Sequence, residues 1–270
     1  MGCKLIAVSV KPTGHFEWGF LAPDGTGVQF YELCESTNTL ACSAGSDGTQ
    51  TPMWFVAGQQ RAGRGRRGRV WTSAPGNLYC SYLFKPVLRI SELATLPFLV
   101  SLAVRDTFIG LGCSPDEVQC KWPNDVLISE KKASGILIES SAAPSLMTDF
   151  IVVGVGLNLA HFPDDAQFGA TSVAVETNNI PDVMSAFKIL SHSLHERLQN
   201  WQPANAVNVI KEWRTCAWGM GIRREIRTND ETFHATLIGL GDDGGLSLLL
   251  DNGNSKRLYA GDVFALPVDC

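Results

Sequence analysis

Five arginines crowd into one short glycine-containing segment, which we call the arginine loop. Residues 58–71 read GQQRAGRGRRGRVW and hold five of the 22 lysines and arginines, in a chain whose formal net charge is −5. Glycines let a backbone approach phosphate oxygens, and guanidinium groups add charge and paired donors. Because apolar strands are predicted on both sides, we interpret the loop as a structured phosphate-binding loop. A nuclear-localisation run or a flexible RNA-binding tract would normally be polar on both sides.

Three further segments carry polar residues at predicted strand ends. Lys121, Asn124 and Asp125 belong to the sequence KWPND, in which the proline fixes a turn, and a capped turn with an internal ion pair would explain them equally well. Lys132 stands before the predicted strand GILIE, where a solvated edge lysine is the commoner case. Asn158 follows two glycines in GVGLN, which suit either a ligand lying on the backbone or a bulge.

Hydrophobic periodicity predicts strands alternating with a few helices to position these residues. A helix should begin at Glu35-Ser36-Thr37-Asn38, whose side-chain oxygens can cap a first turn, and end near Gly45. A long amphipathic helix is expected between Ser91 and Leu111. The predicted strands cover residues 5–10, 28–33, 53–57, 77–84, 118–122, 135–140 and 150–155.

The clearest helical pattern comes later in the chain. Pro181 suits a first turn, and apolar residues then recur every three or four positions as far as Trp201, which predicts a core-facing stripe. Another helix is expected around 207–213. From Ile222 onward, short strands separated by GDDGG and DNG turns predict a small antiparallel β-barrel. We therefore expect two domains in contact, residues 1–215 and 216–270.

Composition excludes several classes of protein. A chain of 270 residues with 45% hydrophobic and 18% charged residues is typical of a globular enzyme. Its acidic balance argues against a general nucleic-acid binder. The eight cysteines are scattered, without the close spacing of a zinc or redox site, which favours a reducing compartment. Without a signal peptide, a lipidation motif or an uninterrupted bilayer-length apolar run, we expect a cytoplasmic protein with no membrane anchor.

The order of the motifs resembles the biotin–protein ligase family. The motifs are ESTN at 35–38, GRGRRGR with a following Trp at 63–71, KWPND at 121–125, KASGILIE at 132–139 and GVGLN at 154–158. Gly261-Asp262-Val263 is similar to the end of that family's small C-terminal domain. The resemblance implies an α+β fold in which helices back a mixed, largely antiparallel sheet, related to lipoate ligases and class II tRNA synthetases. It also implies a C-terminal SH3-like barrel.

The resemblance further implies a two-step reaction. Biotin attacks the α-phosphate of MgATP to give biotinyl-5′-AMP and pyrophosphate, and a lysine of a biotin carboxyl carrier domain then attacks the mixed anhydride. The carrier domain would belong to acetyl-CoA carboxylase or to another biotin-dependent carboxylase. Both steps develop negative charge on phosphate, which cationic side chains, backbone amides and Mg²⁺ can screen in a water-poor pocket. A homodimer stays open.

By the same resemblance, Lys132 and Arg66 are the catalytic residues. Biotin would be bound by Ser36, Thr37, Asn38, Gln60, Gly63, Arg64, Lys132, Gly135 and Gly156. ATP and the adenylate would be bound by Arg64, Gly65, Arg66, Arg69, Trp71, Lys121, Asn124, Asp125, Lys132 and Asn158. The sequence leaves open whether Asp125 reaches Mg²⁺ directly or through water.

The departures from the family pattern remove no required charge. Thr39 stands where bacterial relatives often have Gln, Arg61 replaces a commoner neutral residue, and Ser134 replaces a small apolar one. The residues before Glu35 are too few for the winged helix of some bacterial relatives, so no specific nucleic-acid binding is expected.

Three other functions compete with this interpretation. A lipoate–protein ligase shares the fold but usually lacks the arginine-dense loop and the KWPND turn. A catalytically inactive ligase-like binding protein would have no need of Arg66 and Lys132, which this chain keeps. A nucleic-acid-binding module would show salt-sensitive RNA binding without ATP, and the acidic net charge weighs against it.

Overall fold

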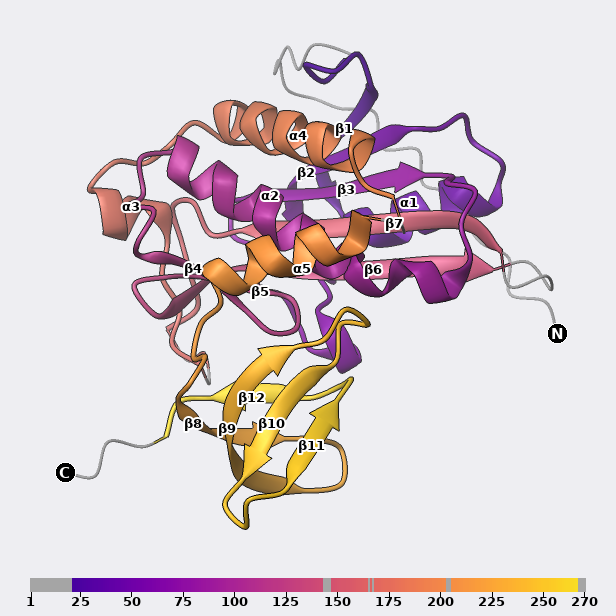
Figure 1. The fold of residues 1–270 in the computed structure, drawn as a ribbon. Coiled ribbons are helices and arrows are strands. Elements are labelled where there is room, and N and C mark those ends of the chain that lie inside the picture. The colour runs from indigo at the N-terminus through magenta and orange to yellow at the C-terminus, as the bar shows by residue number, and fades with distance from the viewer. Residues whose placement is uncertain (1–20, 143–146, 165, 167, 203–204, 267–270) are drawn as a thin grey trace, which may run out of the picture.

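Two β-sheets organise the chain, and the larger one carries most of the predicted elements (Figure 1). The computed structural model describes residues 21–142, 147–164, 166, 168–202 and 205–266, so the predicted strand at 5–10 lies outside the described residues. Strand order in the larger sheet is β1-β2-β3-β7-β6-β5-β4. Only β1 and β2 run parallel, which confirms a mixed, largely antiparallel sheet. Its strands are β1 Gly27–Cys34, β2 Met53–Gln60, β3 Leu78–Phe84, β4 Val118–Lys121, β5 Asp125–Ile128, β6 Lys131–Ala142 and β7 Thr148–Leu157.

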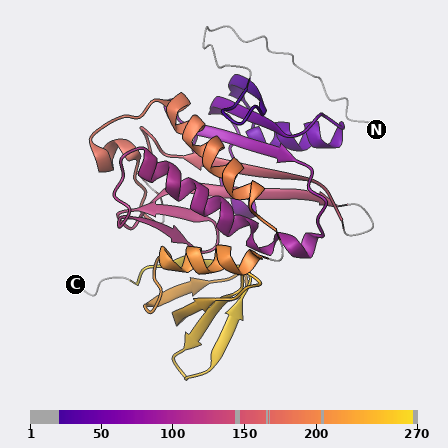
Figure 2. The same cartoon turned by 45° about the horizontal axis from the view of Figure 1, so that its top comes forward.

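Helices cover both faces of this sheet (Figures 1 and 2). Alternation along β2 explains the two layers, because successive side chains of a strand point to opposite faces. Trp54 and Val56 join the core beneath α2 and α4, whereas Phe55 packs with Ala41 of α1 in a smaller cluster. The helices are α1 Thr37–Ser46, α2 Leu96–Gly110, α3 Val173–Thr177, α4 Val183–Gln199 and α5 Ala206–Thr215, with 3-10 turns η1 Arg66–Gly68 and η2 Ile90–Thr95.

The predicted amphipathic helix between Ser91 and Leu111 is instead a 3-10 turn followed by a helix buried nearly all round. Ten of the fifteen residues of α2 are buried, because α4 and α5 pack over the side that a surface helix would expose to water. In the described part of the chain, Ile90–Gly110 is the one helical stretch that is long and apolar enough to cross a membrane, and 61% of its most apolar window is buried within the fold.

The stripe predicted on the later helix is confirmed, but its start is not where proline placed it. Phe187, Leu190 and Leu194 of α4 are buried in the core. Asp182 is the N-cap, and its carboxylate accepts a hydrogen bond of 2.8 Å from the Ser185 amide. Pro181 therefore lies outside the helix, because a carboxylate can satisfy a free amide of the first turn directly.

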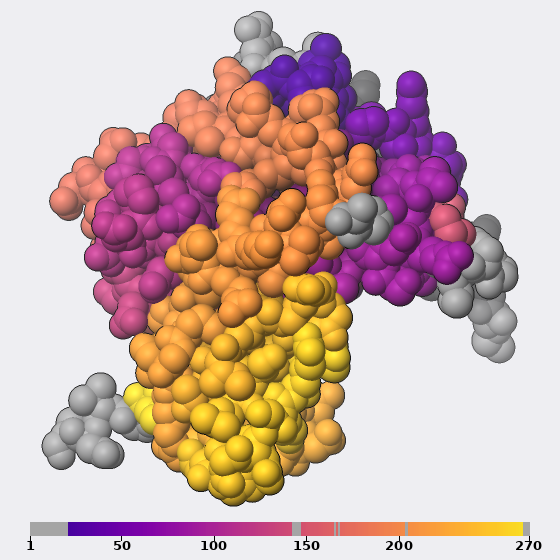
Figure 3. Space-filling model, in the orientation of Figure 1, coloured from indigo at the N-terminus to yellow at the C-terminus, as the bar shows by residue number. Residues whose placement is uncertain are grey.

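The C-terminal strands form a separate antiparallel sheet of order β11-β10-β9-β8-β12. The strands are β8 Arg223–Arg227, β9 Thr232–Leu240, β10 Leu246–Leu250, β11 Ser255–Leu258 and β12 Asp262–Phe264. The predicted GDDGG and DNG turns join β9 to β10 and β10 to β11. The sheet packs directly against the larger part, as Figure 3 shows for the face below α5. There Trp122 Nε1 donates to the carbonyl of Gly244 at 3.2 Å.

Phe187→Ala should lower the free energy of unfolding by about 3–5 kcal/mol, because it leaves a cavity in the core. The Phe187 ring is 2% exposed and meets Trp54 edge to face, with ring centroids 5.3 Å apart. Urea denaturation measures the loss. Lys188→Ala, at an exposed position of the same helix, should change stability by no more than about 0.5 kcal/mol. Equal losses in the two variants would contradict the core role.

Candidate active site

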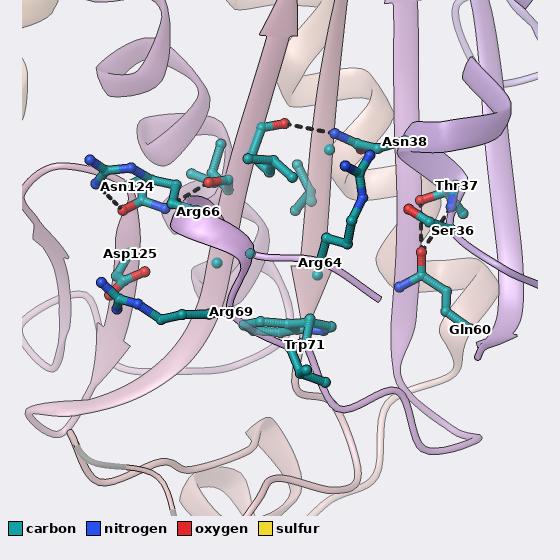
Figure 4. Close-up of a pocket in the computed structure, with 18 of the residues that line it drawn as sticks. Ser36, Thr37, Asn38, Gln60, Arg64, Arg66, Arg69, Trp71, Asn124 and Asp125 are labelled. Atoms are coloured by element: carbon teal, nitrogen blue, oxygen red, sulfur yellow. Dashed lines mark hydrogen bonds between the residues drawn. The ribbon is translucent and has the colours of Figure 1, made fainter. Parts of the chain in front are cut away.

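Two adjoining pockets lie where β5, β6 and β7 meet the arginine loop, and they gather residues from well-separated segments of the chain. Figure 4 shows Ser36, Thr37 and Gln60 at one end of the first pocket. Arg66, Asn124 and Asp125 lie at the other end, and Trp71 lies between the two groups. The first pocket is lined by these predicted residues together with Asn38, Arg64, Gly65, Arg69, Lys132, Gly135 and Gly156. The second pocket adds Lys121 and Asn158 and shares Arg69, Trp71, Asp125 and Lys132 with the first.

Glycines keep the floor of the first pocket free of side chains. A Cβ atom at Gly154 would lie 1.9 Å from Asn38 Oδ1 of α1, which places this floor on the α1 face of the sheet. At Gly156 and at Gly135, directly opposite in register, a Cβ would come within 2.6 and 2.7 Å of the Trp71 ring. The indole therefore lies close against bare backbone, at the boundary that both pockets share.

The uncharged end of the pocket is a hydrogen-bonded network of buried and half-buried side chains. Gln60 Oε1 accepts from the Thr37 amide at 2.8 Å, and Gln60 Nε2 donates to Ser73 Oγ at 3.1 Å. Ser81 Oγ and Thr37 Oγ1 lie 2.8 Å apart, within hydrogen-bond distance. These contacts fix the orientation of each amide and hydroxyl. Ser36 is the N-cap of α1 and is 3% exposed, but its side chain makes no cap hydrogen bond.

Asn38 is held by the protein at both ends of its amide. Its nitrogen donates to Leu137 O at 3.2 Å and to Glu139 Oε2 at 2.8 Å, and its oxygen accepts from Ser81 Oγ at 2.6 Å. Glu139 also forms an ion pair of 3.3 Å with Arg64. Asn38 thus links α1, β3 and β6, and one carboxylate on β6 orients the first arginine that lines the pocket.

The charged end contains one carboxylate between two ammonium groups. Asp125, the first residue of β5, lies 2.7 Å from Lys132 Nζ and 3.3 Å from Lys121 Nζ. The Lys121 side chain is 4% exposed, while the Lys132 side chain is 26% exposed and faces both pockets. Lys132 Nζ also lies 5.5 Å from the centre of the Trp71 ring. The cluster therefore carries two positive charges and one negative charge, next to the indole.

Burial and charge oppose each other in this cluster. Burial alone would raise the pKa of Asp125, but the ammonium groups of Lys132 and Lys121 outweigh it and lower the pKa below its ordinary value. Burial lowers the pKa of Lys121, and Asp125 partly opposes that change. Asp125 is therefore a carboxylate at neutral pH, and it keeps two cations together in a site largely closed to water.

Side chains from other segments of the chain contact the arginine loop, among them Glu139, Asn124 and Asp262. Arg64 pairs with Glu139, and Arg66 Nη1 donates to Asn124 Oδ1 at 3.0 Å. Arg67 and Arg69 both form ion pairs with Asp262 of β12, so the second sheet reaches the pocket. The KWPND turn therefore joins the loop to β6, since Asn124 also donates through Nδ2 to the Ile136 carbonyl at 2.7 Å.

Two predicted residues have mainly architectural contacts. Gly63 lines neither of the two pockets. Its carbonyl accepts a hydrogen bond of 2.9 Å from the Trp71 backbone amide, where the two ends of the loop meet. Asn158 lines the second pocket, but its amide donates to the carbonyls of Lys132 and Thr171 at 3.4 and 3.1 Å. It therefore holds the strand that carries Lys132.

The sequence did not predict four residues that either line the pockets or hold lining residues in place. Glu139 ends the KASGILIE motif and Asp262 lies in Gly-Asp-Val, so both stood within recognised patterns that assigned them no role. Ser81 sits within an apolar strand, and Phe168 belongs to a loop without a motif. No sequence signal marks either of them.

The pocket offers little to a metal ion on its own. Among the described residues there is no group of three or more His, Cys, Asp or Glu side chains that could hold one. Both oxygens of Asp125 already face ammonium groups. Mg²⁺ needs no such cage, because it usually keeps several waters and binds through substrate phosphates. The residues present therefore fit a Mg²⁺ ion that enters with a nucleotide.

Comparison with known proteins agrees with this geometry. The sequence model of the biotin/lipoate A/B protein ligase family matches residues 30–158. A biotin–[acetyl-CoA-carboxylase] ligase of Paracoccus denitrificans is 33% identical, over 85% of this chain and 97% of the relative. A bifunctional ligase/repressor of Bacillus subtilis is 28% identical over 88% and 74%. The biotin protein ligase of Aquifex aeolicus, solved with biotin and ATP, has a TM-score of 0.67 and 25% identity over 87% of this chain and 97% of that one.

The sheet, its helical layers and the cationic pocket define a class of α+β ligases that includes enzymes for biotin and for lipoate. Within that class, the 33% sequence identity over nearly the whole Paracoccus denitrificans ligase points to the biotin enzymes. This chain belongs to the biotin–protein ligases of the biotin/lipoate A/B protein ligase family.

Asp125→Asn should destabilise the protein by about 3–5 kcal/mol at pH 7, because two ammonium groups lose their buried counter-charge. Since the pKa of Lys121 is already lowered, the folded variant binds fewer protons than the unfolded chain below the ordinary lysine pKa of about 10.4. Its free energy of unfolding should therefore rise with pH in that range. The wild type should lose its advantage as pH falls through the lowered pKa of Asp125.

Urea denaturation across a pH series checks this expectation. Asp149→Asn, which removes an exposed carboxylate from β7, is the matched control and should change stability by about 0.5 kcal/mol or less. A pH-independent difference between wild type and Asp125→Asn would exclude the charge cluster as its cause.

Proposed function

We propose that this chain is an ATP-dependent biotin–protein ligase. It forms biotinyl-5′-AMP from biotin and MgATP, and then transfers biotin to a specific lysine of a biotin carboxyl carrier domain. The proposal is carried by one observation, that two pockets with different linings meet at Lys132 and Trp71. Adenylation needs two neighbouring binding spaces, because the carboxylate of one substrate must meet the phosphate of another.

The first pocket suits biotin. A buried ureido ring needs matched donors and acceptors, and Ser36, Thr37 and Gln60 offer oriented hydroxyl and amide groups at the far end. The bare backbone at Gly135 and Gly156 gives the apolar part of the ligand a flat floor beside Trp71. A ligand lying this way points its carboxylate toward Lys132.

The second pocket suits the nucleotide. Lys132 can reach a carboxylate oxygen from the first pocket and a phosphate oxygen from the second, since it lines both. Arg69 and Lys121 add positive charge to the second pocket, and Arg66 adds its guanidinium group from the adjoining first pocket. A bound Mg²⁺ screens the phosphates. The protein's part is to hold the two anions in line and exclude water, and to stabilise the charge that develops on the α-phosphate.

The transfer step requires an amine from outside. The acceptor lysine must arrive unprotonated at the mixed anhydride and displace AMP, which leaves with the bonding electrons on its phosphate oxygen. The relatives named for acetyl-CoA carboxylase favour the carrier domain of that enzyme, or of another biotin-dependent carboxylase, as the source of the lysine. A cytoplasmic location completes the proposal, and a homodimer stays open.

The division of labour within the chain follows the two sheets. Residues 1–215 form the catalytic domain, and residues 216–270 form a small domain of the SH3-like barrel type. The order β11-β10-β9-β8-β12, antiparallel throughout, supports this assignment. The pairing of Asp262 with Arg67 and Arg69 supports a contribution of the small domain to the lining of the pockets.

Biotin, but not lipoate, should support exchange of pyrophosphate into ATP in the presence of Mg²⁺. The polar network at Gln60 demands a ligand with hydrogen-bonding atoms at its ring end, which the dithiolane ring of lipoate lacks. Exchange is measured with biotin, with lipoate and with no acid. Lipoate-only exchange would move the chain to the sister group of ligases, and no exchange with either acid would favour an inactive binding protein.

Lys132→Ala should lower biotin-dependent exchange by at least about 100-fold, the usual scale for losing a group that stabilises developing charge. Lys131→Ala is the matched control, because Lys131 is the exposed neighbour on the same strand. It should keep near-normal exchange. Wild-type rates in Lys132→Ala, from protein of unchanged circular dichroism, would remove Lys132 from the catalytic step.

A further inference from the structure

We propose that Asp262 is a positioning residue that anchors the arginine loop over the pocket before any ligand binds. Its carboxylate acts on the ligands through Arg67 and Arg69, which it holds by ion pairs. The part of this inference that concerns ATP rests on the proposed ligase function. The anchoring itself depends only on contacts within the protein.

Asp262 is well placed for this task. It is the first residue of β12, its side chain is 17% exposed, and it lines both pockets. Arg67 Nη1 lies 3.5 Å from its Oδ2, and Arg69 Nη2 donates to the same oxygen. One carboxylate thus neutralises part of the charge of two guanidinium groups at the boundary between the sheets.

The loop needs such an anchor. Its five arginines repel one another, and a block of like charges favours an open, solvated chain. Arg67 also adopts the left-handed conformation, with φ of 56°, which a residue with a Cβ atom adopts only at a cost in energy. The backbone bonds within the loop are few, among them Gly65 N to Arg69 O at 2.7 Å. External partners must supply the remaining stabilisation.

Of the carboxylates that pair with arginines of the loop, Asp262 is the most shielded. The Glu35 side chain, 4.0 Å from Arg61, is 67% exposed. Glu139, which pairs with Arg64, has a side chain that is 31% exposed, compared with 17% for Asp262. Asn124, which binds Arg66, carries no charge. Water screens an ion pair less as its exposure falls. Asp262 should therefore contribute most to the order of the loop.

This arrangement divides the arginines into two groups. Arg67 and Arg69 pair with Asp262 of the second sheet, whereas Arg64 and Arg66, which line the first pocket, contact Glu139 and Asn124 of the larger part. Anchoring the first pair presents the second pair in a fixed position, so less ordering is required when the phosphates bind. Without the anchor, ATP binding would have to order the loop as well, and its apparent affinity would fall.

The test compares Asp262→Asn with Asp251→Asn in the full-length protein without ligands. Asp251 pairs with Arg223 in the same sheet at 2.6 Å, and its side chain is 60% exposed and lines none of the described pockets at the active site. Limited trypsin digestion, followed by mass spectrometry, reports how often the loop opens. Cleavage after Arg66, Arg67 and Arg69 should be about tenfold faster in Asp262→Asn, the scale expected for losing a hydrogen bond to a charged group. Asp251→Asn should match the wild type.

Cleavage after Arg105 in α2 separates local opening from unfolding, because that helix belongs to the core. If Asp262→Asn accelerates cleavage at Arg105 equally, Asp262→Glu provides the second variant, since it keeps the charge. Restored protection of the loop in Asp262→Glu would support anchoring. Loop cleavage at the wild-type rate in a folded Asp262→Asn protein would overturn it.

The kinetic readout is biotin-dependent ATP–pyrophosphate exchange. The KM for ATP should rise about tenfold in Asp262→Asn, with kcat little changed, because the cost lies in ordering the loop. A lower KM would mean that the carboxylate competes with phosphate, and would overturn the proposal. If the wild-type protein showed no pyrophosphate exchange, the proposed ligase function would be refuted. The anchoring role of Asp262 would not be, because trypsin digestion tests it without any ligand.

Discussion

One carboxylate shared by two buried or half-buried ammonium groups is the constraint on which the pocket depends. Asp125 holds Lys121 and Lys132 together, and its negative charge opposes the lowering of the Lys121 pKa that burial causes. The cluster is left with a surplus of positive charge that an incoming anion can neutralise. The KWPND turn, the start of β6 and the amide of Asn158 all serve to keep these three side chains at their distances.

The larger sheet supports this electrostatic arrangement by having two different faces. One face is filled with apolar side chains beneath α2 and α4, and the other is cleared by glycines on β6 and β7. Trp71 lies against the cleared backbone and so defines two neighbouring spaces rather than one. The packed core on the α2 and α4 face therefore supports the glycine floor of the first pocket on the opposite face. The charged residues line the pocket beside that floor.

Local patterns predicted most of the strands and the helix start at Ser36, because each depends on residues near in sequence. The phosphate-binding role of the arginine loop stays a prediction. Long-range packing decided the rest. The helix predicted between Ser91 and Leu111 is present as α2, but its amphipathic character was wrong, because α4 and α5 cover the side that it would otherwise expose. Pro181 lies outside α4, since Asp182 is the N-cap. Ser81 became part of the polar network only through folding, since a serine within an apolar strand has no distinguishing neighbours in sequence.

The ion pair between Arg69 and Asp262 joins residues 193 positions apart. During synthesis, the segments that line the first pocket as far as Gly156 leave the ribosome about a hundred residues before Asp262, a delay of roughly 5–20 s at ordinary translation rates. Over that interval a nascent chain can form the larger sheet and bring Lys121 and Lys132 to Asp125. Its arginine loop, however, has no carboxylate from β12 to bind. The order of translation thus separates the making of the binding surface from the fastening of the loop that covers it.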